Sequence, residues 1–172
     1  MKRLVLPLFL VGALLGLGVA SASAAASTTT TIVHVDVSFS ETDTCGFQLD
    51  WHIQGSFKDT EFFDSSGTLV KVIETNTGGP FTYTITNPAN GKTATTRSQT
   101  VVGILTFNPD GSLDTVTQNG IVFNFVLPGT GTIALDVGTV AFDSEGNLLK
   151  IGGPHQFLMG DVAGFCAALA DP

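Results

Sequence analysis

Apolar and polar side chains alternate with a period of two along most of this chain. The alternation is clearest in two stretches, with apolar side chains at Val33, Val35, Val37 and Phe39, and then at Phe47, Leu49, Trp51 and Ile53. This period is typical of a strand with one buried face. Similar runs predict further strands at 68–76, 81–87, 93–107 with a break near Gly103, 113–118, 121–127, 132–142 and 148–151. The pattern predicts an all-β core.

One turn sequence occurs three times between the predicted strands. It reads Phe, Asp or Asn, two variable residues, Gly, one variable residue and Leu, and it starts at Phe63, Phe107 and Phe142. The Asp or Asn can accept hydrogen bonds from the turn backbone, and Gly can adopt the positive φ that closes a hairpin. Strands joined by short hairpins lie antiparallel. The predicted fold is an antiparallel up-and-down barrel, with a two-sheet β-sandwich as the alternative.

One short helix is predicted towards the C-terminus. Asp161 suits the N-cap, and the residues that follow place one apolar stripe at Val162, Phe165, Cys166 and Leu169. Gly164 weakens the helix by about 1 kcal/mol relative to Ala. We expect the helix to lie against the strands with Cys166 facing inward.

The first 24 residues have the form of a secretory signal peptide. Lys2 and Arg3 precede an apolar run over 4–19, and small residues at 20–22 or 22–24 fit a cleavage site. A transmembrane anchor is the alternative, but the run is shorter than the roughly 20 residues of a membrane span. We therefore expect a secreted, extracellular protein with no membrane span after cleavage. Residues 25–31 are predicted to form a flexible linker, and 32–172 a single β-domain.

Removal of the leader makes the chain more acidic. The whole chain has a formal charge of −8, and the mature part holds five basic and fifteen acidic residues, a charge of −10. Such a charge disfavours nucleic acid and anionic lipid surfaces as partners. The common nucleotide-binding, serine-hydrolase and zinc-protease motifs do not occur. No cofactor is predicted.

Two cysteines, Cys45 and Cys166, lie in the mature part of the chain. Oxidation is the default for an exported protein, so we expect them to form a disulfide. A bond closing a loop this long stabilises by roughly 4 to 5 kcal/mol in the loop-entropy model. A reactive or metal-binding thiol pair is the alternative.

The first predicted hairpin offers a cluster of polar side chains. If Phe39 pairs with Phe47, one face is wholly apolar, and the other places Asp36 opposite Asp50 and His34 opposite His52. Such a cluster could bind a divalent cation or supply an acid/base pair. A solvated outer face explains the same residues, and a register shifted by two positions would separate them.

Other candidate residues indicate a function less clearly. His155 precedes the predicted helix in a loop, and we expect it at the surface. Trp51 and Tyr83 are the only residues of their kinds, which is poor provision for a stacking sugar site. The thirteen Phe residues suit a core or an apolar cavity.

Several short segments resemble a group of uncharacterised secreted actinobacterial β-rich proteins. They are Cys45-Gly46-Phe47, the stretch from Thr84 to Lys92, the Asp110-Gly111 turn and the C-terminal Cys166. This resemblance implies secretion and a β-rich fold but brings no established activity with it. A looser likeness to allene oxide cyclase and dirigent-type barrels rests on strand number and secretion, at the level of fold alone.

These observations predict a secreted, non-enzymatic β-protein that binds a small apolar ligand or a cell-envelope component. One alternative is a cofactor-free barrel enzyme of the cyclase or isomerase type, with His34, Asp36, Asp50 and His52 inside a lumen. Another is a structural or interaction module of the cell surface, which a broad exposed apolar patch would indicate.

Overall fold

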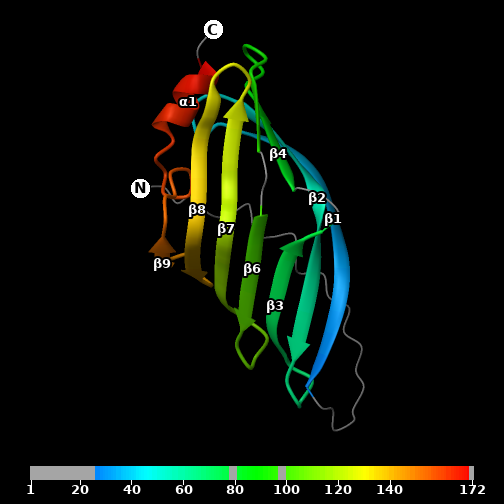
Figure 1. Cartoon of the computed structure of the whole chain (residues 1–172). Helices are drawn as coiled ribbons and strands as arrows, with labels where there is room; N and C mark the ends of the chain where they lie inside the picture. The colour runs from blue at the N-terminus through cyan, green and yellow to red at the C-terminus, as the bar shows by residue number, and fades with distance from the viewer. Residues whose placement is uncertain (1–25, 78–80, 97–99, 171–172) are drawn as a thin grey trace.

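The computed structural model describes residues 26–77, 81–96 and 100–170, so the predicted signal peptide lies outside the described residues. Nine strands and one helix follow one another along the chain (Figure 1). They are β1 (Ser27–Glu41), β2 (Leu49–Phe63), β3 (Leu69–Asn76), β4 (Thr82–Thr86), β5 (Thr93–Thr96), β6 (Thr100–Phe107), β7 (Leu113–Leu127), β8 (Gly131–Asp143), β9 (Leu148–Gly152) and α1 (Ala163–Ala170). All nine strands belong to one antiparallel sheet. The prediction of a mostly β fold with one short C-terminal helix is confirmed.

The two long strands β2 and β7 organise the sheet. Strand β1 pairs with β2 over its whole length, so β3 and β4 share the other edge of β2, one at each end. Strand β8 likewise follows β7, and β6 and β5 share the opposite edge. Since β3 pairs with β6 and β4 pairs with β5, the pairings form a partial ring. We call the end with β4 and β5 the upper half and the end with β3 and β6 the lower half.

The outermost strands distinguish this arrangement from the expected closed barrel. Among the described residues, β1 pairs only with β2, and β9 pairs only with β8. No described strand covers either edge of the sheet, and the strands form a curved sheet with a partial ring (Figure 1). No second sheet forms from the described strands, so the sandwich alternative is wrong.

Several strand boundaries differ from those predicted. Strand β1 begins at Ser27, so the linker prediction is wrong for the last five residues of 25–31, which pair with the end of β2. Gly103 lies inside β6 and does not break it. The two strands predicted at 113–118 and 121–127 are one strand, β7, with a bulge between Ile121 and Phe123. The bulge changes which positions of β7 face inward, and this change of phase made one strand look like two.

The three repeated turns have the predicted form. In the β2–β3 turn, the Asp64 N–H donates to the Thr68 carbonyl and the Gly67 N–H donates to the Asp64 carbonyl. The same two backbone bonds recur between β6 and β7 and between β8 and β9. The glycines at 67, 111 and 146 have φ values of 82°, 82° and 78°. The repeated sequence is therefore one hairpin solution used three times.

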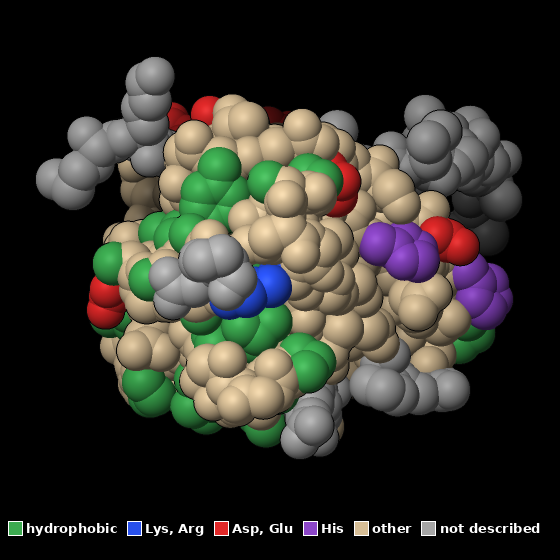
Figure 2. Space-filling view, turned by 90° about the horizontal axis from the view of Figure 1, so that it is seen from above, with side chains coloured by type: hydrophobic (Ala, Val, Ile, Leu, Met, Phe, Trp, Pro, Cys, Tyr) green, Lys and Arg blue, Asp and Glu red, His purple; other side chains and the backbone are tan. Residues whose placement is uncertain are grey.

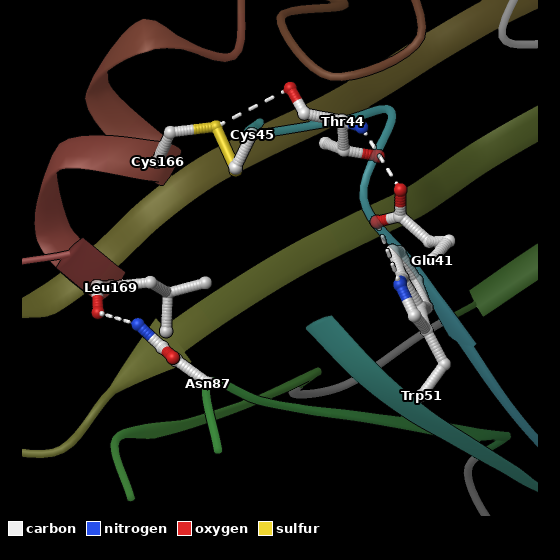
Figure 3. The surroundings of a disulfide bond; sticks show 7 residues. All are labelled: Glu41, Thr44, Cys45, Trp51, Asn87, Cys166 and Leu169. Carbon is white, nitrogen blue, oxygen red and sulfur yellow. Dashed lines mark hydrogen bonds between the residues drawn. A yellow bond between two sulfur atoms is a disulfide. The ribbon is translucent and has the colours of Figure 1, made fainter. Parts of the chain in front are cut away.

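The predicted disulfide is present and fastens α1 to the β1–β2 loop (Figure 3). Cys45 and Cys166 are joined across 121 residues. The helix begins at Ala163, and its first described bond runs from the Cys166 N–H to the Val162 carbonyl. Val162 therefore holds the N-cap position that the sequence assigned to Asp161.

The C-terminal end of α1 is held by the β4–β5 turn. The Asn87 and Asn90 side-chain amides donate to the Leu169 carbonyl at 3.0 and 2.9 Å, and the Lys92 ammonium donates to the Ala168 carbonyl at 3.0 Å. These carbonyls have no partner within a helix, and a cation is favourable at a helix C-terminus. The turn thus fixes the C-terminal end of α1, and the disulfide fixes its middle, over the upper half of the sheet (Figure 1).

The main core lies between α1 and one face of the upper half, which we call the inner face. Its fully buried side chains include Leu49, Ile85, Phe123, Phe125, Phe165 and Leu169. Residues of the predicted helix stripe, Phe165 and Leu169, face this core as expected. In the described part of the chain no helix is long and apolar enough to cross a membrane.

Candidate functional site

The register of the first hairpin differs from the predicted one. Phe39 pairs with Trp51 and not with Phe47, a shift of four positions. The cause lies in the loop before β2, where the Glu41 carboxylate accepts hydrogen bonds from the Trp51 indole N–H at 3.2 Å and from the Thr44 backbone N–H at 2.9 Å (Figure 3). A shift by an even number keeps the same face buried, so the alternation fits both registers.

The shift separates the residues of the predicted polar cluster. Asp36 no longer lies opposite Asp50, nor His34 opposite His52, so this part of the prediction is wrong. His34 instead contacts Ser56, with 2.7 Å between the imidazole Nδ1 and the hydroxyl oxygen. All four residues nevertheless share the outer face of the hairpin, as the alternation predicted.

The contacts that remain on the outer face are local and solvated. The His52 Nε2 lies 2.9 Å from the Asp36 carboxylate, and the two side chains are 41% and 81% exposed. Asp50 accepts hydrogen bonds from Gln48 and Ser40, both at 2.7 Å, and these bonds lower its pKa. Asp50 is therefore held ionised and already has its partners.

A hollow of about 400 Å³ lies beside this hairpin. It is lined by Ser38, Phe39, Ser40, Asp50, Trp51, His52, Thr84 and Thr86. Seen from above, histidine and acidic side chains gather on one flank of the molecule (Figure 2). No group of three His, Cys, Asp or Glu within the described ranges could hold a metal ion. The outer face thus presents a polar surface without a metal centre.

A second set of acidic residues lies on the inner face of the lower half. Asp59 of β2 pairs directly with Glu74 of β3. Paired residues share one face of a sheet, and Asp59 is in phase with Trp51, which faces the core. Glu61 follows two positions later in β2 and faces the same way. Three carboxyl groups therefore lie together on a face that is otherwise largely apolar.

Burial sets the chemistry of this acid pair, as we name Asp59 and Glu74. Asp59 is only 9% exposed, and its Oδ1 atom is buried without a hydrogen-bond partner. Burial raises the pKa of Asp59 to about 6, and the charge of Glu61 adds to the effect. Burial also raises the pKa of Glu74 to about 7, with a further contribution from the Asp59 charge. Near neutral pH the pair can hold a proton.

The neighbouring strand β6 gives Glu74 its space. Gly103 lies opposite Glu74, and a Cβ atom at Gly103 would approach the Glu74 Oε2 to 2.8 Å. Gln118 of β7 pairs with Gly103 on its other side. The adjacent row of the same face holds Val72, Leu105 and Val116, which pair across β3, β6 and β7. Glu74 thus extends over a glycine between apolar side chains.

A different buried carboxylate supports the segment that precedes α1. Asp136 is fully buried and accepts hydrogen bonds from the backbone N–H groups of Phe157 and Leu158, at 2.9 and 3.0 Å. His155 forms an isolated bridge with Asp136 and is only 6% exposed. The expectation that His155 lies at the surface is wrong, because this bridge draws its loop onto the sheet. Asp136 places Phe157 in the upper core.

Comparisons with protein-family models, with curated proteins and with solved structures found no match. The resemblance to secreted actinobacterial proteins stays a prediction.

The acid pair was not among the residues that the sequence singled out. The predicted alternation was followed in β2 only as far as Ile53, whereas the strand continues to Phe63. The alternation does continue, and it places Asp59 and Glu61 in phase with the buried positions of β2. Two acidic residues in the apolar phase of a strand were the signal that could have found the site.

Proposed function

We propose that the protein binds a small, mainly apolar molecule against the inner face of the lower half. This is the expected ligand-binding function, with its site assigned to the acid pair and the side chains around it. The single observation that carries the proposal is the buried Asp59 Oδ1 atom that lacks a hydrogen-bond partner. A buried polar atom without a partner is costly, and a ligand that supplied the missing contact would recover that cost.

The surroundings of the acid pair suit such a ligand. Val72 and Val116 are 7% and 5% exposed, while Leu105 is half-buried. Small-molecule sites in proteins are commonly apolar, with few polar groups that fix the ligand's orientation. On this face the apolar wall would supply most of the contact area, and Asp59 would supply the orientation.

The test uses binding of the neutral fluorescent probe N-phenyl-1-naphthylamine to the purified protein. Leu105 and Val102 lie on opposite faces of the same strand, β6, so Leu105→Gln and Val102→Gln form a matched pair. We expect Leu105→Gln to weaken binding at least about fivefold, since it removes apolar contact, and Val102→Gln to leave it unchanged. Equal losses in both variants, or no binding by the folded protein, would contradict the proposal.

A second candidate function is self-association through the open edge of β9. Leu148, Leu149 and Ile151 of this strand are 40%, 57% and 44% exposed. An exposed edge strand with apolar side chains favours pairing with another chain. Light scattering after size-exclusion chromatography would report a dimer, and Leu149→Lys should convert it to a monomer. A monomer at all accessible concentrations would exclude this function.

The residues on which the enzyme alternative was based do not line a lumen. It required His34, Asp36, Asp50 and His52 inside a lumen, and they lie on the outer face. No further support for a cyclase or isomerase arises from these four residues.

A further inference from the structure

We propose that the acid pair recognises the protonated amine of an otherwise apolar molecule, and that the amine replaces a proton bound to one of the two carboxyl groups. This inference rests on the proposed function, because it names the chemical group that the bound molecule carries. It adds a charge requirement and a proton exchange that apolar binding alone does not need.

The first support is the hydrogen-bonding state of Asp59. The side chain is nine-tenths buried, and its Oδ1 atom has no donor within reach. An ionised carboxylate is an acceptor only, so the group that satisfies it must be a donor. An ammonium group has three N–H donors and a positive charge, and a charge-assisted hydrogen bond is about twice as strong as a neutral one.

The second support is that no cationic side chain of the described strands faces the site. The only other titratable side chain that the described strands direct to this part of the inner face is Glu61. Strand β1 contributes Thr31 and β7 contributes Gln118, while the facing positions of β6 are Gly103 and its apolar neighbours. Like charges therefore accumulate there, with no lysine or arginine from these described strands to balance them.

The third support is the shape of the surface beside Glu74. Gly103 has no side chain, and the Glu74 carboxylate lies over it, since a Cβ atom there would come within 2.8 Å of the Glu74 Oε2. Val72 and Val116 keep the surroundings apolar. A hydrated metal ion would find no set of three ligands among the described residues, whereas an amine with an apolar body fits both the charges and the wall.

The exchange conserves charge and atoms. Before binding, one carboxyl group of the acid pair is protonated and holds that proton in an O–H bond. On binding, that O–H bond breaks and the proton passes to water, while the ammonium ion takes its place with its own N–H bonds intact. One ammonium ion enters for each proton released, so the site keeps the same net charge. Raised carboxyl pKa values near neutrality support this exchange.

The experiment compares three probes with the same alkyl chain, n-octylamine, n-octanol and n-octanoate, by isothermal titration calorimetry on the purified protein. At about pH 7.5 we expect octylamine to bind at least tenfold more tightly than the other two. At about pH 5.5 the advantage should fall by roughly tenfold, because the pair is then protonated. Titrations near pH 6.5, between the pKa values of the two carboxyl groups, in buffers of different ionisation enthalpy should show release of close to one proton per amine bound.

Three variants test the residues themselves. Asp59→Asn and Glu74→Gln should each abolish the preference for the amine, and either one suffices if the other fails to fold. Asp36→Asn is the matched control, since Asp36 is an exposed carboxylate on the outer face. It should keep the tenfold preference, because a change in overall charge alone should not remove it.

The outcomes separate this inference from the proposed function. Octanol binding as tightly as octylamine would overturn the amine assignment and leave the apolar site standing. Tighter binding of octanoate, amine binding without proton release, or an equal loss in Asp36→Asn would also overturn the assignment. If none of the three probes binds, both proposals fail.

Discussion

The upper and lower halves of the inner face are built on the same two strands, β2 and β7, yet they hold different contents. In the upper half the face carries aromatic rings, and α1 and the segment before it cover them. In the lower half the same face of β2 carries Asp59 and Glu61. The alternation of a strand thus specifies which side chains face inward, and the residue types decide whether that face becomes a core or a site.

The upper half shows how completely a face can be filled. Phe125 lies 5.3 Å from the rings of Phe123 and Phe157 and 5.5 Å from that of Phe165, measured between ring centroids. The Trp51 ring meets Phe125 edge-on at 6.2 Å. Aromatic pairs at these separations add to the stability gained by burial. The upper half is therefore expected to carry most of the stability of the fold.

The largest loss of stability is expected from a cavity in the upper half, and it tests whether this half stabilises the fold more than the lower half does. Phe125→Ala should lower the free energy of unfolding by about 3–5 kcal/mol, because a fully buried ring is removed. Phe57→Ala is the control in the lower half, where Phe57 is only half-buried, and it should cost about half as much. Urea unfolding followed by Trp51 fluorescence measures the free energy of unfolding of both variants. Equal losses would mean that the two halves contribute equally to stability.

Removal of the disulfide should have the next largest effect. The variant with Cys45→Ala and Cys166→Ala should lose about 2–5 kcal/mol, because the long closed loop is opened in the unfolded chain. Reductant should destabilise the parent protein and leave the variant unchanged. If α1 depends on the bond, hydrogen exchange should quicken in Ala163–Ala170 and not in β3 or β6, and uniform quickening would argue against a local role.

The acid pair should make the lower half sensitive to pH. Burial raises the pKa of Asp59 to about 6 and that of Glu74 to about 7 in the folded protein, so the folded state holds protons that the unfolded state has lost. Stability should therefore fall as pH rises from about 4 to about 7, by on the order of 2 kcal/mol, and then level off.

The variant with both Asp59→Asn and Glu74→Gln should remove this fall, while Asp36→Asn should keep it. Thermal unfolding across this pH range measures the difference between the curves. An unchanged slope in the double variant would show that other groups cause the pH dependence.

The smallest effect concerns the space beside Glu74. Gly103→Ala would bring a Cβ atom to 2.8 Å from the Glu74 Oε2, which the flexible end of that side chain can avoid by moving. We expect a loss of about 1 kcal/mol or less and a change in the carboxyl pKa values, which carbon-detected NMR of the side chains can follow. Gly67→Ala is not a suitable control because its φ of 82° is itself strained with a side chain, so Val102→Ala serves instead.

Local sequence patterns predicted the local parts of this fold well. The turns at Asp64, Asn108 and Asp143 follow from residues within five positions of one another. The disulfide was predicted because the chain has two cysteines and was expected to be exported. Each of these predictions needed only chemistry that neighbouring or unique residues determine.

The register of β1 against β2 could not be predicted in the same way. Two registers that differ by an even number bury the same side chains, so the choice depends on the loop between the strands. In the folded protein Glu41 selects the register through its bonds to Trp51 and Thr44. The prediction of a closed barrel went too far for a related reason, because the number of strands does not determine whether the outermost strands pair.

The acid pair could not be predicted from the sequence, because Asp59 and Glu74 belong to different strands. Asp59 and Glu74 are fifteen positions apart and become neighbours only through the β2–β3 register. The turn at Phe63 was predicted, but the alternation of β2 was followed only as far as Ile53, so Asp59 was assigned to neither face. Burial, which gives these carboxyl groups their chemistry, is a property of the whole sheet and not of either strand.

The covalent link between Cys45 and Cys166 also imposes an order of events on the newly made chain. The first hairpin can pair as soon as it emerges, but its loop cannot be locked until synthesis has passed position 166. Until then the chain offers Cys45 no second cysteine to pair with. The bond can therefore form only after all nine described strands have been synthesised, and its formation needs an oxidant that accepts two electrons.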